Sequence, residues 1–289
     1  MRWQKGRSSD NVVESSGGGG GFGRGRIRLG LGGTILALVV AAVFPSTRGV
    51  IFGLLTDGDA GLAGGSAQVT QVDPNDPQVQ FVSKILGSTE DVWVAVFSAS
   101  GAAYKDPKLV LFHGSVSTAC GNATAAVGPF YCPDDQRVYL DLDFFRELAT
   151  RFHSDSDFAR AYVIAHEVGH HVQNLLGVMD MEKKLQARGQ PMEGANGLSV
   201  RLELQADCLA GVWANHSEQQ LQWLQAGDVE AALNAASQIG DDTLQREARG
   251  TVVPDSFTHG SSAQRVRWFQ TGFKSGNLGV CDTFNAQRL

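Results

Sequence analysis

Apolar residues recur three and four positions apart in the segment that ends near Gly177, which is the spacing of one face of an α-helix. This apolar stripe consists of Phe158, Ala161, Ala165, Val168, Val172 and Leu175. Four residues that favour helix N-caps precede it at positions 154–157, and Gly177 follows as a stop signal. The pattern therefore predicts a helix that includes Ala161–Gln173.

A second helix is predicted over Arg201–Gly211, with Asn196 or Ser199 as its cap; its apolar stripe consists of Leu198, Leu202, Leu209 and Val212. Strands are predicted over Gln136–Leu142, which alternates apolar and polar residues, and over Val92–Phe97 and Leu109–Phe112. Residues 217–250 return to a helical pattern. We expect an α+β fold with a small mixed sheet, two central helices and a helical C-terminal part.

The first predicted helix contains a His-Glu-x-x-His motif, formed by His166, Glu167 and His170. Positions i and i+4 share one face of a helix, so both imidazoles can bind one metal ion, with Glu167 beside a bound water. This pattern is typical of a zinc hydrolase in which the Glu is the general base. His171 lies about 100° further round the helix, which favours a supporting or surface role. The alternative is two histidines that only make local hydrogen bonds.

A tetrahedral catalytic zinc ion needs a third protein ligand. Glu203 and Asp207 are four positions apart on the second predicted helix and therefore share a face. We expect Glu203 to complete the ligand set for one catalytic Zn²⁺. Asp207 can then accept a hydrogen bond from the second ring N–H of a ligand imidazole and fix its tautomer. The alternative is a solvated acidic face.

Four segments carry a resemblance to a known family. They are AYVIAHEVGHHVQ at residues 161–173, ELQADCLAGVWA at 203–214, GPFYCPDDQRVYLDL at 128–142 and PDSFTHGSSAQRVRWF at 254–269. They resemble the bacterial putative neutral zinc metallopeptidases, and the resemblance extends over roughly Asp76 to Cys281. It implies a zincin-like metallopeptidase domain, with an active-site helix, a second ligand helix and an edge strand.

The Glu-x-x-x-Asp spacing also resembles the membrane-associated heat-shock and prenyl-processing zinc endopeptidases, where the Glu is the third ligand. In those proteins a His followed six positions later by Arg lies near the substrate. His259 and Arg265 have this spacing, although Gly260 replaces the Pro that commonly follows the His. The resemblance implies that the pair stabilises the oxyanion or orients Asp207.

The resemblance has one further implication, which concerns the Gly128–Leu142 region. In related zinc proteases an edge strand beside the active-site helix binds an extended peptide by main-chain pairing. We expect this region to supply that strand. An ordinary edge strand without substrate is the alternative.

Charge divides the chain into two parts. The first 28 residues contain six Lys or Arg against two acids, whereas the remainder contains eighteen against twenty-eight. The acidic balance of the larger part argues against nucleic acid as a partner. The Gly-rich stretch from Ser15 to Gly25 is typical of a disordered linker. Residues 1–26 are thus predicted to be a disordered, basic cytoplasmic segment.

Residues 29–44 contain no charged side chain and follow three closely spaced arginines. A membrane-spanning helix takes about 20 apolar residues, with a range of about 17 to 25, so this run is at the short limit. We predict a transmembrane helix over 27–48, a linker over 49–75 and the metallopeptidase domain over 76–289. A cleaved signal peptide is the alternative, because Val40-Ala41-Ala42 offers a cleavage site. Both alternatives keep the basic flank in the cytoplasm and export the domain.

The four cysteines are Cys120, Cys132, Cys208 and Cys281, and their spacing does not match a zinc ribbon. In an exported domain they predict two disulfides, for which three connectivities are possible. Cys120–Cys132 is the expected local pair, and Cys208–Cys281 follows by elimination. Four reduced cysteines in a cytosolic protein are the alternative.

Together these features predict a single-pass cell-membrane zinc metallopeptidase whose exported domain cleaves protein or peptide substrates. Two other functions remain open: a zinc-binding envelope or assembly protein without activity, and a zinc amidase acting on cell-wall peptides. The intact Glu167 argues against the first, since a structural zinc site needs no general base.

Overall fold

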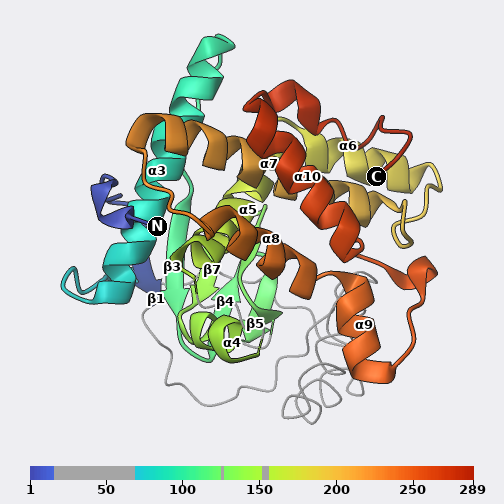
Figure 1. The fold of residues 1–289 in the computed structure, drawn as a ribbon, viewed down its shortest axis with the longest axis horizontal. Helices are drawn as coiled ribbons and strands as arrows, with labels where there is room; N and C mark the ends of the chain where they lie inside the picture. Colours follow the sequence, from blue (N-terminus) through green and yellow to red (C-terminus); the bar gives the residue numbers. More distant parts are fainter. Residues whose placement is uncertain (16–68, 125–126, 152–155) are drawn as a thin grey trace.

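The computed structural model describes residues 1–15, 69–124, 127–151 and 156–289 (Figure 1). In this part of the chain a five-stranded sheet consists of β1 (Val12–Ser15), β2 (Val69–Gln71), β3 (Lys108–Phe112), β6 (Phe130–Cys132) and β7 (Arg137–Asp141). The helices are α3 (Pro77–Ala99), α4 (Asp143–Arg151), α5 (Asp157–Leu175), α6 (Val178–Ala187), α7 (Leu198–Leu221), α8 (Asp228–Gln238), α9 (Asp241–Arg249) and α10 (Ser262–Ser275). This mixed α+β architecture, with a small sheet and a helical C-terminal part, agrees with the prediction.

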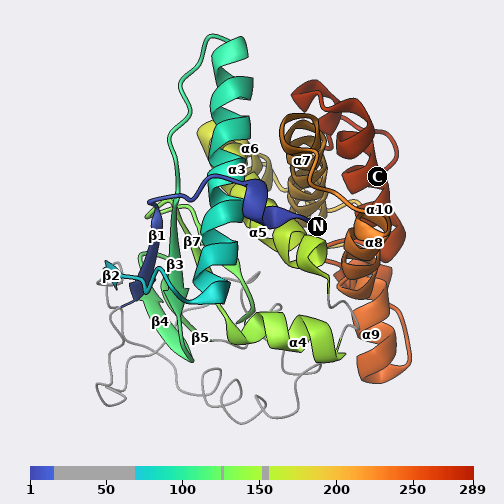
Figure 2. The same ribbon diagram turned by 60° about the vertical axis from the view of Figure 1, so that its left-hand side comes forward.

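The strand order of the main sheet is β2-β1-β3-β7-β6. The three central strands β1, β3 and β7 run parallel, and the outer strands β2 and β6 pair antiparallel to their neighbours. Parallel strands are usually buried on both faces. Here one face packs against helices α3 and α5, and α7 and α10 lie beyond α5 (Figure 2).

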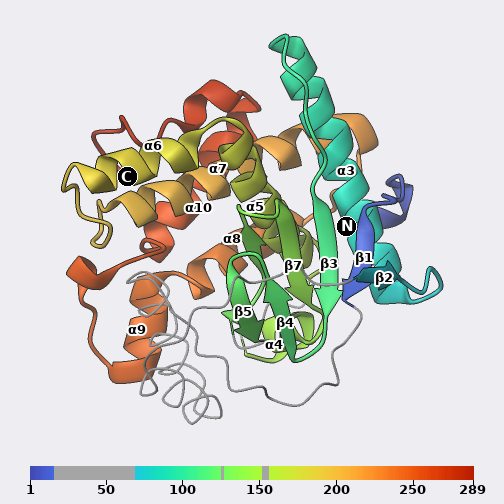
Figure 3. The same cartoon turned by 180° about the vertical axis from the view of Figure 1, so that it is seen from behind.

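Alternate residues of the central strands pack on opposite faces of the sheet. Leu109, Leu111 and Val138 join the large core beneath the helices, whereas Val110 and Tyr139 join a smaller core on the other face. A hairpin of β4 (Ser115–Thr118) and β5 (Gly121–Thr124) covers that second face (Figure 3). Strand β7 is therefore a fully buried central strand and not the half-buried strand that its alternating pattern predicts.

The edge of the sheet next to α5 is β6, which belongs to the Gly128–Leu142 region but precedes its alternating segment. Tyr131 on β6 and His171 on α5 are joined by a hydrogen bond of 3.1 Å between the tyrosine hydroxyl and Nδ1. The edge strand thus lies directly beside the helix that carries the His-Glu-x-x-His motif.

The prediction of a strand at Val92–Phe97 is wrong, because these residues belong to the long helix α3. Asp76 caps this helix by accepting hydrogen bonds from the N–H groups of Gln78 and Val79, and proline occupies its first turn at position 77. Val92 and Trp93 are buried, and Phe97 is buried one helical turn after Trp93, whereas Val94 between them is exposed. Tertiary packing outweighs the local strand propensity here.

The prediction that residues 1–26 are a disordered segment is wrong for residues 1–15. Val12–Ser15 forms β1, which lies between β2 and β3 with Val12 and Val13 buried. The predicted linker over 49–75 contains β2, so the sheet also extends outside the predicted domain boundary at residue 76. Two valines in a polar segment are a weak strand signal, and only pairing with β3 makes them part of the core.

The predicted transmembrane segment 27–48 lies outside the described residues. Among the helices that the structure does describe, none combines the length and the apolar character needed to cross a membrane.

Two disulfides confirm the expected pairing of the cysteines. Cys120 at the turn of the β4–β5 hairpin is bonded to Cys132 on β6, and Cys208 on α7 is bonded to Cys281 near the C-terminus. The first fixes the hairpin to the sheet. The second fixes the C-terminal segment to the helix that also carries Glu203 and Asp207.

The longer disulfide loop should contribute more to stability. Replacing Cys208 and Cys281 with serine opens a loop with a sequence separation of 73. The chain-entropy model assigns about 4 kcal/mol to a loop of this length and about 3 kcal/mol to the short loop. We expect urea unfolding to show a larger loss for Cys208→Ser/Cys281→Ser than for the matched Cys120→Ser/Cys132→Ser protein. A larger loss in the second protein would contradict this expectation.

Candidate metal centre

Helix α5 presents the His-Glu-x-x-His motif from within the core. The helix begins where the Ser156 side chain accepts a hydrogen bond from the Ala159 N–H, and its apolar stripe fixes its rotation against the sheet and α7. His166, Glu167 and His170 are each less than a tenth exposed. The two imidazole rings lie one helical turn apart, with their centroids separated by 4.9 Å.

Helix α7 approaches α5 closely at Gly169, inside the motif. A Cβ atom at this position would lie 3.1 Å from the backbone oxygen of Ala206 and 3.2 Å from its Cα. Glycine therefore allows the two helix backbones to come near enough for Glu203 to reach the histidines. Gly169 acts through packing and not through chemistry.

His166, His170 and Glu203 bring three ligand atoms to within 4.8 Å of one another. The Glu203 carboxylate lies 3.1 Å from His166 Nε2 and 3.6 Å from His170 Nε2. Ligand atoms about 2.1 Å from a tetrahedral zinc ion lie about 3.4 Å from one another. The spacing of these donors therefore matches a zinc site, and the three residues are those that the sequence predicts.

Asp207 lies behind His166 and is completely buried. Its Oδ1 atom accepts hydrogen bonds from the Tyr162 hydroxyl at 2.5 Å and from His166 Nδ1 at 2.8 Å. Arg265 on α10 donates to both carboxylate oxygens at 2.9 and 3.0 Å. Because Nδ1–H of His166 is held by Asp207, Nε2 is directed toward Glu203 and is available to a metal ion.

His170 is oriented in the same way by a residue of its own helix. Its Nδ1 lies 2.8 Å from Oε1 of Gln173, which is itself completely buried. Gln173 donates in turn to the backbone oxygen of Leu202 at 2.7 Å, so it also connects α5 to α7. Nε2 of His170 is thereby left facing Glu203.

The electrostatics of the cluster favour a positive charge between its members. Burial by itself lowers the pKa of His166, but Asp207 and Glu203 outweigh burial and raise it to about 10. Burial raises the pKa of Glu203, yet His170 and His166 together lower it below its usual range. A divalent cation can take the place of the imidazole proton, and nitrogen and carboxylate ligands suit zinc. The residues present therefore fit the metal.

Glu167 differs from the other carboxylates of the cluster. Burial raises its pKa, and the charges of His170 and His166 reduce that shift. A buried carboxylate whose basicity is raised is suited to accept a proton near neutral pH.

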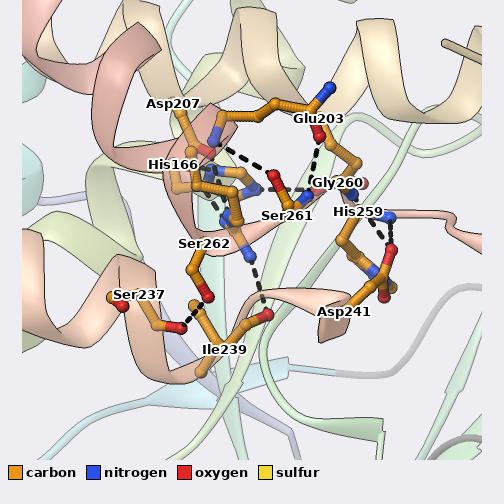
Figure 4. Close-up of polar contacts among 12 residues, drawn as sticks. His166, Glu203, Asp207, Ser237, Ile239, Asp241, His259, Gly260, Ser261 and Ser262 are labelled. Atoms are coloured by element: carbon orange, nitrogen blue, oxygen red, sulfur yellow. Dashed lines mark hydrogen bonds and ion pairs between the residues drawn. The ribbon is translucent and has the colours of Figure 1, made fainter. Parts of the chain in front are cut away.

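Arg265 and His259, which the resemblance to the heat-shock and prenyl-processing endopeptidases treats as a pair, make different contacts in the structure. Arg265 is buried and bound to Asp207, with its pKa well above the usual value because Asp207 and Tyr162 outweigh the effect of burial. His259 lies in the loop before α10, and its side chain is 25% exposed. Burial lowers its pKa, but the Asp241 and Glu203 carboxylates outweigh burial and raise it. Arg265 thus orients Asp207, whereas His259 lies between Asp241 and Glu203 (Figure 4).

The backbone conformation after His259 explains why glycine stands there in place of proline. Gly260 has a φ angle of +89°. Proline is restricted to φ near −65°, so it cannot occupy this position in the observed loop.

His171 is completely buried and takes no part in the cluster. Its Nε2 atom donates to the backbone oxygen of Lys105 at 2.6 Å, while Nδ1 accepts from Tyr131. Burial lowers its pKa, which favours this neutral tautomer. Its role is to hold the edge strand β6 against α5.

Three residues of the site were not predicted from the sequence: Tyr162, Gln173 and Asp241. Tyr162 and Gln173 lie four positions before His166 and three positions after His170, so helical spacing offers a signal for both. Asp241 lies 18 positions before His259 and offers no local signal.

Comparisons with known proteins identify the family of this chain. The model of the family described as "Putative neutral zinc metallopeptidase" matches residues 1–284. The chain is 49% identical over 291 residues to the uncharacterized protein YpfJ of Escherichia coli K12, covering 98% of this chain and 99% of the relative. It is 44% identical over 212 residues to the uncharacterized protein Rv2575 of Mycobacterium tuberculosis H37Rv, covering 70% and 69%. No solved structure matches the chain.

Removing the charge of Asp207 should weaken metal binding. In Asp207→Asn the partner of His166 Nδ1 loses its charge, and changes of this kind typically cost about 10- to 100-fold in metal affinity. Zinc affinity is measured by competition with a chromogenic chelator, with circular dichroism to verify folding. Asp228→Asn, which alters another buried carboxylate on α8, should retain wild-type affinity. Equal affinities for wild type and Asp207→Asn would show that Asp207 does not support the metal site.

Proposed function

Because the chain belongs to the putative neutral zinc metallopeptidase family, we propose that it is a zinc-dependent peptidase that hydrolyses peptide bonds. The observation that carries this proposal is the convergence of His166, His170 and Glu203 within 4.8 Å. A buried Glu167 of raised pKa lies between the two histidines in the sequence of α5. A site that served only structure would not need this fourth residue.

Zinc held by His166, His170 and Glu203 would polarise the substrate carbonyl and supply a water whose pKa is lowered to about 7. Glu167 removes a proton from the attacking water and passes it to the departing amine. Proton transfer of this kind typically contributes about 10² to 10⁴ in rate. Asp207 and Arg265 keep the His166 ring in one orientation throughout, so the geometry does not have to reorganise during the reaction.

His259 is the proposed donor to the oxyanion that develops on the substrate carbonyl. Its side chain is partly exposed, and a ring N–H of this histidine can donate to a developing negative charge. Strand β6 is the proposed docking strand for an extended peptide. It is an outer strand of the sheet, and it lies against α5 through Tyr131 and His171.

We propose that the domain is exported, and that residues 29–44 contact a membrane. Two disulfides support export, because such bonds persist in oxidising compartments. The uncharged run at 29–44 and its basic flank support the membrane contact.

Glu167→Gln tests the mechanism most directly. The amide cannot accept the proton of water, so cleavage of a peptide library should fall by at least about 10²-fold. Zinc content, measured by atomic absorption, should remain at the wild-type level because Glu167 is not one of the three ligands.

Glu230→Gln, an exposed change on α8, is the matched control and should cleave like wild type. A chelator should abolish the activity of the wild-type protein. If Glu167→Gln cleaves as fast as wild type, the proposed mechanism is wrong. If wild type binds zinc but cleaves neither peptides nor cell-wall amides, the non-catalytic alternative is correct.

A further inference from the structure

The loop that carries His259 is held by one carboxylate. Asp241, at the start of α9, is 2% exposed. Its Oδ2 atom accepts hydrogen bonds from three consecutive backbone N–H groups, those of Thr258, His259 and Gly260, at 2.7, 2.7 and 3.0 Å. The Asp241 N–H donates in return to the Gly260 oxygen at 2.9 Å. The main chain on either side of His259 is therefore fixed to α9.

Asp241 also constrains the His259 ring. Its second carboxylate oxygen lies 3.4 Å from Nδ1, and the Thr258 hydroxyl lies 2.9 Å from the same nitrogen. With Nδ1 held on this side, Nε2 is the ring nitrogen that remains for a substrate. In Figure 4 His259 lies between Asp241 and Glu203, so the ring is held at the edge of the candidate metal centre.

We propose that Asp241 is a positioning residue that directs His259 toward the substrate oxyanion. This inference rests on the proposed peptidase function. It assigns Asp241 no contact with the substrate; its effect passes entirely through the His259 loop and ring. Asp242, its neighbour, binds the N–H and hydroxyl of Ser262 and serves as a structural reference on the same helix.

The test is a double-mutant cycle on kcat/KM with a quenched-fluorescence peptide that wild type cleaves. Loss of an oxyanion donor costs about 10² to 10³ in kcat, so His259→Ala should fall by roughly that factor. Asp241→Asn should lower kcat by about tenfold or more, since small misplacements of catalytic groups have effects of this size. Adding Asp241→Asn to His259→Ala should change nothing further, because residues that act as a unit are not additive.

A merely structural role gives a different result. Asp241→Asn would then lower kcat/KM by the same factor in both backgrounds, and this outcome would overturn the proposal, as would full activity of Asp241→Asn alone. Asp242→Asn should behave like wild type, and all variants should retain zinc. An inactive wild type would contradict the proposed function itself, whereas an active wild type with additive effects would contradict only the role of Asp241.

A separate observation concerns the N-terminal segment, defined here as residues 1–15. Its side chains donate hydrogen bonds to the carboxylate of Glu90 on α3, a residue that is only 3% exposed. Arg7, Ser9 and Asn11 donate to the two Glu90 oxygens at 2.7, 2.5 and 2.8 Å. Without the segment a buried carboxylate would lose all three partners, which is a strongly unfavourable arrangement.

The backbone of the N-terminal segment is fitted equally closely. A Cβ atom at Gly87 of α3 would lie 2.4 Å from the Arg7 oxygen, so the glycine allows the segment to cross the helix in contact. Trp3 packs edge-on against Phe81, with ring centroids 5.5 Å apart. Strand β1 pairs with β3 on one side and with β2 on the other. The family model also matches from residue 1.

The two described residues that flank positions 16–68 are neighbours in the sheet. Ser15 of β1 and Val69 of β2 are register partners in an antiparallel pair, so their Cα atoms lie about 5 Å apart. A chain that crossed a membrane once between these residues would place them on opposite sides of a core about 30 Å thick. The β1–β2 pairing and a single membrane crossing between these residues therefore exclude each other.

We infer that the N-terminal segment is retained in the mature protein and lies on the same side of any membrane as the metal centre. Neither the predicted single-pass anchor nor removal of the first 42 residues is compatible with β1 in the sheet.

Two variants of the full chain, each with one added cysteine, test this arrangement; the four native cysteines are held in disulfides and do not react. Ser8→Cys is exposed in the N-terminal segment, and Ser98→Cys is exposed on α3. Intact cells are treated with a membrane-impermeant maleimide, and lysed cells serve as the control for reactivity. Both cysteines should be labelled, or both protected. Labelling of only one would overturn the inference, as would an intact mass showing that residues 1–15 are missing from the mature chain.

Discussion

The arrangement of the three helices around the metal centre depends on one buried charge. Asp207 of α7 accepts hydrogen bonds from Tyr162 and His166 of α5 and from Arg265 of α10. A buried carboxylate that stays charged, as the lowered pKa of Asp207 indicates, is stable only when it is paired and hydrogen-bonded. The helices must therefore pack so that all these donors reach the same two oxygens. The helix packing that supplies the hydrogen bonds to the Asp207 carboxylate also orients the His166 ring.

A buried carboxylate that accepts several hydrogen bonds also occurs at two other places. Glu90 binds the N-terminal segment to α3, and Asp241 binds the His259 loop to α9. In each case a carboxylate on a helix fixes a segment from elsewhere in the sequence. Both segments also bury apolar side chains, Val12 and Val13 in one and Phe257 in the other. Charge-assisted hydrogen bonds add the directionality that hydrophobic burial lacks. The metal centre, the loop beside it and the N-terminal segment thus share one structural principle.

The sequence predicted the site better than it predicted the sheet. His166 and His170, like Glu203 and Asp207, are four residues apart on helices, so the local geometry already places each pair on one face. The meeting of the two pairs was inferred from the ligand requirement of zinc and from family resemblance. The predicted strand at Val92–Phe97 is wrong because β-branched residues favour a strand locally, while packing places this segment in α3. Strand β1 was missed because four residues carry too little periodicity to be recognised.

The sequence by itself determined which residues can bind a metal, which helices carry them and how the cysteines could pair, because spacing along a helix is a local property. Only the tertiary structure decided that Asp241 supports His259, that Arg265 binds Asp207, and that Val12–Ser15 belongs to the sheet. These contacts join residues separated by 18 to 97 positions. Their formation depends on the packing of the whole core, which no local pattern encodes.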